Sequence, residues 1–255
     1  MTTTMATQQL GRAWFENLSE ASTNTGGSLL TGEVELNGVK SALAAIVPDA
    51  DSPFPRARNG EVGLRESLEL ARWVGSLEDP TQPIIVIIDV PSQAYGYFEE
   101  LFGINFALAT SVNALAQARL DGHPIISLIV GKAISGAFLA TGLQSNRILS
   151  LTHDGVQVQV MSKQAAARIT QRTIAELDKA AESVPAMAFD GASFRTLGAV
   201  HGAIDDENVT NVKAVLESTL IDIQDTTLNS RLESPEAQDS RALSIQVREA
   251  VNDQW

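Results

Sequence analysis

Two short apolar runs, at residues 84–90 and 124–130, constrain the fold more than any other feature of the sequence. They read IIVIIDV and PIISLIV, and an alanine-rich segment at residues 105–120 that suits a helix lies between them. A continuous apolar and β-branched run predicts a strand covered on both faces, and a helical connection joins parallel strands. The pattern therefore predicts a parallel sheet with helices on its faces.

Further predicted elements extend this alternation along the chain. The Asn37-Gly38 pair between two β-compatible runs predicts a hairpin over residues 29–47. The remaining elements are helices at 10–18, 64–77, 163–170 and 173–183, strands at 147–151 and 156–161, a polar linker at 21–28, and loops at 49–60 and 91–103. Strands alternating with helices over residues 60–205 predict an α/β fold with a largely parallel sheet.

We divide the chain into an N-terminal segment (1–28), a main domain (29–230) and a polar C-terminal helix or tail (231–255). With 255 residues, 44% of them apolar and 19% charged, the composition is typical of a globular protein with a sizeable core. The N-terminus lacks the pattern of a signal peptide, and no apolar run has the roughly 18 residues that a membrane span needs. We therefore expect a soluble, cytoplasmic protein with no membrane span.

The composition also excludes several kinds of site. The chain has no cysteine, which excludes disulfides, thiolate nucleophiles and zinc–thiolate centres. Its three histidines do not form a metal-binding pattern, so we expect no metal. A net charge of −13 opposes nonspecific binding to nucleic acid, whose phosphates would be repelled.

The segment from residue 121 to residue 150 is the candidate site. We expect the strand at 124–130 to end at the turn GKAISG, residues 131–136, and a helix to follow at 137–145. The first backbone N–H groups of a helix have no intrahelical partner and point at whatever lies in front of the turn. Such groups can stabilise a developing thioester enolate or a carboxylate without a charged side chain. A turn that only packs the helix against the sheet would use the same small residues, so both interpretations stay open.

Three stretches carry a family resemblance. They read GKAISGAFLATGLQSNRILSL, VQVQVMSKQAAARIT and ELDKAAESVPAMAFDGASFRTLGAVHGAID. Together they resemble the gamma subunits of malonate decarboxylase, in the carboxyltransferase branch of the crotonase superfamily. The first is shared loosely with acyl-CoA carboxyltransferases, whose turn usually reads KAYGGA; here Ser135 replaces the first glycine and Ile134 the aromatic residue. The pairing of MSKQAAARIT with ESVPAMAFD is narrower and indicates malonate decarboxylase.

The resemblance, which covers roughly residues 60–205, implies a crotonase-like spiral of ββα units and an enzyme subunit that is active only with a partner. A homologous beta subunit would share the active site. An acyl-carrier (delta) subunit would present the malonyl thioester on a phosphoribosyl-dephospho-CoA arm, and an alpha subunit would be the acetyl-ACP:malonate transferase. The reaction would release CO₂ and leave an acetyl thioester, with no cofactor bound by this chain.

Two alternatives stay open beside this interpretation. The chain could instead be the alpha-like subunit of a biotin-dependent acyl-CoA carboxyltransferase, although such subunits often carry a double glycine at the turn, where this sequence has Ser135-Gly136. It could also be a non-catalytic scaffold that completes the pocket of the beta subunit.

The resemblance also suggests site residues. We expect the backbone N–H groups of Gly136 and Ala137 to hold the enolate oxygen, with Ser135 shaping the turn and Gly136 providing close approach and a positive φ. The predicted substrate-binding residues are Lys132, Ile134, Tyr95 and Tyr97. The lysine would attract the malonyl carboxylate or the phosphates of the carrier arm, and the tyrosines would wall the pocket. A solvated lysine and tyrosines packed at a surface or interface are the simpler alternatives.

Overall fold

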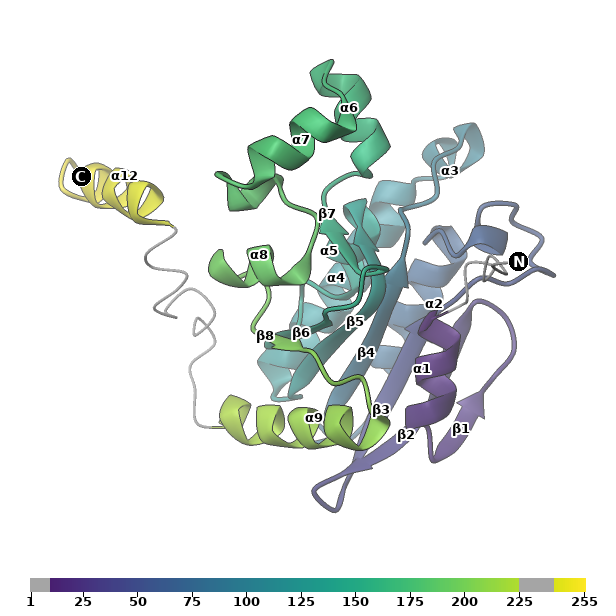
Figure 1. The fold of residues 1–255 in the computed structure, drawn as a ribbon. Coiled ribbons are helices and arrows are strands. Elements are labelled where there is room, and N and C mark those ends of the chain that lie inside the picture. The colour runs from purple at the N-terminus through teal and green to yellow at the C-terminus, as the bar shows by residue number, and fades with distance from the viewer. Residues whose placement is uncertain (1–9, 225–240) are drawn as a thin grey trace, which may run out of the picture.

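The structure, a computed structural model, describes residues 10–224 and 241–255. Figure 1 shows one twisted sheet with helices against both faces. Its strands are β1 (Ala21–Asn24), β2 (Leu29–Leu36), β3 (Val39–Ile46), β4 (Ile84–Val90), β5 (Ile125–Ile134), β6 (Arg147–Leu151), β7 (Gln157–Gln159) and β8 (Gly202–Ile204). The α-helices are α1 (Leu10–Leu18), α2 (Leu64–Val74), α3 (Tyr97–Leu101), α4 (Ile104–Asp121), α5 (Ser135–Thr141), α6 (Lys163–Thr170), α7 (Ile174–Ala181), α8 (Gly191–Thr196), α9 (Val209–Gln224) and α12 (Ala242–Asn252).

The sheet is largely parallel, as the sequence predicts. Its strand order is β1-β2-β3-β4-β5-β6-β8, and β7 pairs with the last residues of β5. The β1–β2 and β2–β3 pairs are antiparallel, and every later pair is parallel. Asn37 and Gly38 both have positive φ and form the tight turn between β2 and β3, which confirms the predicted hairpin.

The core is built around the two apolar strands β4 and β5. Every residue of β4 except Asp89 is buried, and so is every residue of β5 except Lys132. Helices α2 and α4 pack against each other behind the sheet, and α1 and α9 lie in front of it (Figure 1). Phe15 and Leu18 of α1 are each 1% exposed. Burying two such side chains contributes about 2 kcal/mol each, so α1 is part of the same core as the sheet.

The structure corrects three predictions of local structure. The strand predicted at 124–130 continues to Ile134, because β7 pairs with its last three residues, and the next helix begins at Ser135. The predicted linker at 21–28 contains β1, which finds a partner in β2. The predicted loop at 91–103 contains the short helix α3. The predicted boundary at residue 230 lies outside the described residues, as do residues 1–9.

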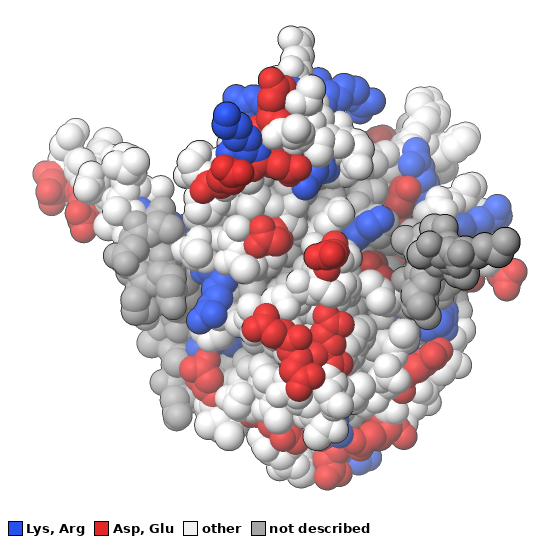
Figure 2. Space-filling view, in the orientation of Figure 1, with Lys and Arg blue, Asp and Glu red and all other residues white. Residues whose placement is uncertain are grey.

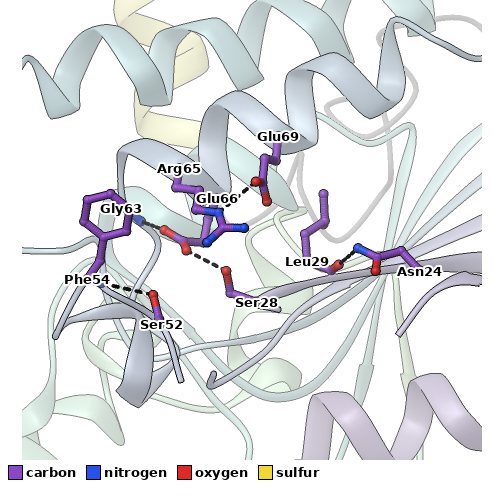
Figure 3. A network of polar contacts seen from close by, with 9 residues as sticks. All are labelled: Asn24, Ser28, Leu29, Ser52, Phe54, Gly63, Arg65, Glu66 and Glu69. Carbon is purple, nitrogen blue, oxygen red and sulfur yellow. Dashed lines mark hydrogen bonds and ion pairs between the residues drawn. The ribbon is translucent and has the colours of Figure 1, made fainter. Parts of the chain in front are cut away.

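A buried carboxylate fixes the start of α2. Glu66 is 1% exposed, and its Oε1 accepts a hydrogen bond from the Ser28 hydroxyl at 2.6 Å. Its Oε2 accepts one from the backbone N–H of Gly63 at 3.0 Å, so the carboxylate joins the start of β2 to the first turn of α2 (Figure 3). Both carboxylate oxygens have a donor, which is what a buried acidic group requires.

The molecular surface is acidic in places and apolar in others. Figure 2 shows acidic side chains outnumbering basic ones over the lower part of the face in view. The exposed large apolar residues of α3 and the adjoining end of α4 are Tyr97, Phe98, Leu101, Phe102 and Phe106, which are 62% to 76% exposed. On α12, Leu243, Val247 and Val251 recur every fourth residue and are also exposed. In the part of the chain that the structure describes, no helix combines the length and apolarity of a membrane span.

Candidate active site

The site forms where the carboxyl ends of two neighbouring strands meet. Strands β4 and β5 are parallel, so both end at the same edge of the sheet. The segment after β4 carries Gln93 and Tyr95, and β5 leads directly into Ser135 and Gly136 at the start of α5. Ligand sites of open α/β sheets commonly lie at this edge. Side chains about 40 residues apart in sequence are thereby brought into contact.

Three hydrogen bonds connect these four residues. The Oε1 atom of Gln93 lies 2.5 Å from Ser135 Oγ and 2.9 Å from the backbone nitrogen of Gly136. The Tyr95 hydroxyl lies 2.8 Å from Ser135 Oγ. An amide oxygen only accepts, so the Ser135 hydroxyl donates its one proton to Gln93. The Tyr95 phenol must therefore donate to Ser135.

Gln93 is held in place by its neighbours in the chain. The Val62 N–H donates to the carbonyl of Ser92 at 3.0 Å, and the Ala94 N–H donates to the carbonyl of Val62 at 2.8 Å. Val62 directly precedes Gly63, whose N–H is bound by the buried carboxylate of Glu66. The backbone at Gln93 is therefore fixed on both sides, and its side chain reaches across to α5.

The positive φ in this turn belongs to Ser135, not to Gly136 as the sequence analysis expected. Ser135 has a φ of 66°, and Gly136 is not among the residues with positive φ. For a residue with a side chain this conformation costs roughly 1–2 kcal/mol. The two hydrogen bonds of the Ser135 hydroxyl offset that cost. Gly136 has a different use, since a Cβ there would lie 3.0 Å from Gln93 Oε1, and glycine leaves room for this amide.

The other predicted site residues differ in their exposure and in their contacts. Ala137 is fully buried and Ile134 is 2% exposed, so neither meets solvent in the free chain. Tyr97 lies on the exposed face of α3, with its ring edge against Phe98, while Tyr95 reaches Ser135. The Lys132 side chain is half-buried and forms no ion pair with any residue in the described ranges. The roles of these residues in substrate binding stay predictions.

Asp89 is a further structural residue at this edge that is not among the residues predicted from the sequence. Its Oδ1 accepts a hydrogen bond from the Lys132 N–H at 3.0 Å, and its Oδ2 accepts one from the Gly11 N–H at 3.1 Å. The β4–β5 register shifts here, between Ile88 and Val90, which makes room for the carboxylate. A Cβ on Gly131 would overlap Asp89, so the glycine is required by this packing.

Gln93 is a second site residue that the sequence prediction does not include, although the sequence holds a signal for it. Polar residues that directly follow a buried parallel strand lie at the edge where ligands bind. Gln93 follows β4 by three residues and so fits that description. What the sequence could not supply is the contact itself, because it depends on how far β5 extends before α5 begins.

Two surface hollows lie away from these residues. One, of about 470 Å³, is lined by Arg65, Arg72 and Trp73 among others. A second, of about 310 Å³, includes His153 and Lys163 in its lining. Neither is lined by Gln93, Ser135 or Gly136. Within residues 10–224 and 241–255, no group of three His, Asp or Glu side chains is arranged to hold a metal ion.

Comparison with known proteins decides the family. The sequence model of the malonate decarboxylase gamma subunit matches residues 57–255. The chain belongs to the malonate decarboxylase gamma subunit family. It is 42% identical to a chain of Pseudomonas malonate decarboxylase, solved as a hetero-tetramer in complex with coenzyme A, with a TM-score of 0.86 over 97% of this chain and 100% of that one. The MdcD–MdcE hetero-dimer from Pseudomonas gives the same identity and coverage with a TM-score of 0.84.

More distant relatives of this gamma subunit family member are carboxyltransferases. The malonyl-S-ACP:biotin-protein carboxyltransferase MADD of Malonomonas rubra is 31% identical over 206 residues, which cover 77% of this chain and 69% of the relative. A transcarboxylase 12S chain has 19% identity and a TM-score of 0.67, covering 85% of this chain and 42% of its own length. At that identity the likeness concerns the fold alone. The crotonase-like fold that the resemblance implied is confirmed.

Proposed function

We propose that this chain supplies the gamma half of a site that decarboxylates malonyl-S-acyl-carrier protein to acetyl-S-acyl-carrier protein and CO₂. Membership of the malonate decarboxylase gamma subunit family supports the reaction. The observation that carries the site assignment is the convergence of two donors, the Ser135 hydroxyl and the Gly136 N–H, on a single carbonyl oxygen, that of Gln93. A position where two donors hold one carbonyl oxygen can also hold the carbonyl oxygen of a thioester.

The proposed reaction needs a place for negative charge rather than a nucleophile. The bond between the α-carbon and the carboxylate breaks, CO₂ leaves, and the electron pair forms a thioester enolate. In this proposal the backbone N–H groups of Gly136 and Ala137 hold the oxygen on which charge develops, and Ser135 shapes the turn. One such donor lowers the barrier by about 3–4 kcal/mol in well-studied sites. A proton then bonds to the α-carbon and gives the acetyl thioester. Tyr95, Tyr97, Ile134 and Lys132 are the proposed substrate-binding residues.

We further propose the partners of the chain. A homologous beta subunit would complete the site, as the MdcD–MdcE hetero-dimer of Pseudomonas suggests. The exposed apolar residues of α3 and α12 suit burial against such a subunit. A delta carrier subunit would present the malonyl group on a phosphoribosyl-dephospho-CoA arm, and an alpha subunit would exchange acetyl for malonyl groups. The complex would act in the cytoplasm.

A second candidate function has an observation in its favour. The Malonomonas rubra relative is a carboxyltransferase to a biotin protein. In that alternative the carboxyl group would pass to biotin on a partner instead of leaving as CO₂. The chemistry at this chain would be the same, because both reactions form the thioester enolate.

The test is CO₂ release from malonyl-S-carrier protein by this chain purified with its beta subunit, with and without avidin. We expect release that avidin does not inhibit. Inhibition by avidin would favour the biotin-dependent alternative. A Gly136→Val variant should lose most turnover, because its side chain would fill the space in front of the donors. If this variant retains full turnover, the chain is a scaffold and not a catalytic half-site.

A further inference from the structure

We propose that the side chain of Gln93 closes the oxyanion site of the free chain, and that the thioester carbonyl of the substrate must displace it. The inference rests on the proposed function, since it concerns the same donors. It makes Gln93 a residue that sets the affinity for substrate by competing with it. Removing such a residue raises the affinity for substrate, whereas removing a residue that helps to bind the substrate lowers it.

The amide oxygen of Gln93 is a chemical equivalent of the carbonyl that the site is proposed to hold. Both are carbonyl oxygens that accept hydrogen bonds, and Oε1 lies 2.5 Å from Ser135 Oγ and 2.9 Å from the Gly136 nitrogen. Donors to a substrate oxyanion lie at about 2.7–3.1 Å. The two oxygens would therefore occupy the same position, and only one can be present at a time.

Displacement requires only a side-chain rotation. The backbone on either side of Gln93 is held by Val62, through bonds of 3.0 Å and 2.8 Å to Ser92 and Ala94. In the part of the chain that is described, the Gln93 side chain is bonded only through its Oε1, to Ser135 and Gly136. Rotation thus breaks two hydrogen bonds and leaves the backbone unchanged. Gln93 is half-buried, so water can bond to its amide once it has moved.

The residues on either side of Gly136 are buried. Ala137 is fully buried and Ser135 is 6% exposed. A substrate oxygen cannot approach the proposed donor of Ala137 unless the atoms that cover it move. Gln93 is the side chain in contact with Ser135 and Gly136 from the solvent-facing loop after β4. Its displacement therefore uncovers the Ser135 hydroxyl and the Gly136 N–H together.

The consequence is a lowered apparent affinity. When only a fraction of the molecules is open, the apparent dissociation constant rises in inverse proportion to that fraction. Variants that cannot close the site should therefore bind a thioester carbonyl more tightly. They should bind the carrier without its acyl group as before, because that ligand brings no carbonyl to these donors.

The experiment uses the complex of this chain with its beta subunit. Gln93→Met keeps the length of the side chain and removes the amide, and Gln93→Ala removes both. The control is Gln117→Met on α4. Among the described residues its amide bonds only to Asp121, on the surface near the C-terminal end of this helix. The inhibition constants of acetyl-S-carrier protein and of HS-carrier protein are measured against malonyl-S-carrier protein.

We expect both Gln93 variants to bind acetyl-S-carrier protein about five- to a hundredfold more tightly, the range set by the net strength of the two hydrogen bonds that Gln93 no longer makes, with HS-carrier protein unchanged. Gln93→Glu should bind acetyl-S-carrier protein more weakly than the wild type, because a carboxylate binds the same donors more strongly than an amide oxygen does. Equal or weaker binding of acetyl-S-carrier protein by Gln93→Met and Gln93→Ala overturns the inference. If the two variants bind equally or more weakly while the wild-type complex releases CO₂, only this inference fails. If the wild-type complex releases no CO₂, the proposed function itself fails.

Discussion

The phenol of Tyr95 donates a hydrogen bond to the Ser135 hydroxyl at 2.8 Å, although 40 residues separate them. Ser135 in turn donates to Gln93, so one serine hydroxyl is oriented from both sides. The phenol lies at the solvent end of this series of hydrogen bonds, since Tyr95 is 46% exposed while Ser135 is 6% exposed. A surface tyrosine thereby fixes the direction of a buried hydroxyl in the candidate site.

Replacing Tyr95 with Phe should lower the activity of the complex. The ring stays, but Ser135 loses its donor, so its hydroxyl is free to rotate away from the site. We expect kcat/KM for malonyl-S-carrier protein to fall about two- to tenfold, the effect of one ordinary hydrogen bond. Ser218→Ala is the control, because it removes an exposed hydroxyl on α9 that bonds to the Val215 carbonyl and lies outside the proposed site. Equal losses in the two variants would show that the Tyr95–Ser135 bond has no part in the reaction.

The backbone at Ser135 gives a prediction on stability. Its φ of 66° favours glycine, which carries no Cβ. Ser135→Gly and Ser135→Ala both lose the hydroxyl, but only the alanine variant keeps the conformational cost. We expect the glycine variant to be more stable than the alanine variant by about 1 kcal/mol in urea unfolding. Equal stabilities would mean that the turn relaxes to a negative φ when the hydroxyl is gone.

Much of the sheet could be predicted because its signal is local. Strands β4 and β6 have the predicted bounds, 84–90 and 147–151, and α1 spans the predicted residues 10–18. In each, the pattern of apolar residues alone indicates the element. The extension of β5 could not be predicted in this way. It exists because β7, more than 20 residues further along, pairs with it.

The sequence predicts the turn at the candidate site but not the geometry around it. The turn at Ser135 and Gly136 could be recognised, because small residues between a strand and a helix are a local pattern. The positive φ at Ser135 and the contact of Gly136 with Gln93 could not. Both depend on the segment after β4, whose path is set by Val62 and, through Gly63, by the buried carboxylate of Glu66. These are contacts between distant parts of the chain.

The start of α7 gives a pH-dependent prediction. Hydrogen bonds from the Thr173 backbone N–H, at 2.7 Å, and from its hydroxyl, at 2.9 Å, lower the pKa of the Glu176 carboxyl. Because the folded-state pKa is lowered, the ionised carboxylate stabilises the helix start at pH values above the ordinary pKa of a glutamate. This stabilisation is lost as the pH falls through the lowered pKa. Thr173→Ala should raise the pKa of Glu176 towards its ordinary value, as measured by NMR titration. Thr170→Ala is the control, because the Thr170 hydroxyl bonds to a carbonyl on α6. This change should leave the pKa of Glu176 unchanged.

Asp89 should contribute to stability through its two backbone donors. Asp89→Asn replaces one carboxylate oxygen with an NH₂ group, so either the Lys132 N–H or the Gly11 N–H loses its acceptor. We expect the free energy of unfolding in urea to fall by about 1–3 kcal/mol, the cost of a buried donor without a partner. An unchanged free energy would show that water replaces the lost acceptor.

The contact between Asp89 and Gly131 predicts that substitutions at the two positions are not additive. Gly131→Ala should destabilise the chain because its Cβ would overlap the Asp89 carboxylate. In an Asp89→Ala background that overlap is gone, so the same change should cost less, a difference that a double-mutant cycle measures. Gly75→Ala is the control, since a Cβ there meets only ordinary contacts, the nearest at 3.4 Å, and φ is −68°. Additive effects at Asp89 and Gly131 would show that the overlap is relieved by movement of the β4–β5 register shift rather than by loss of the carboxylate.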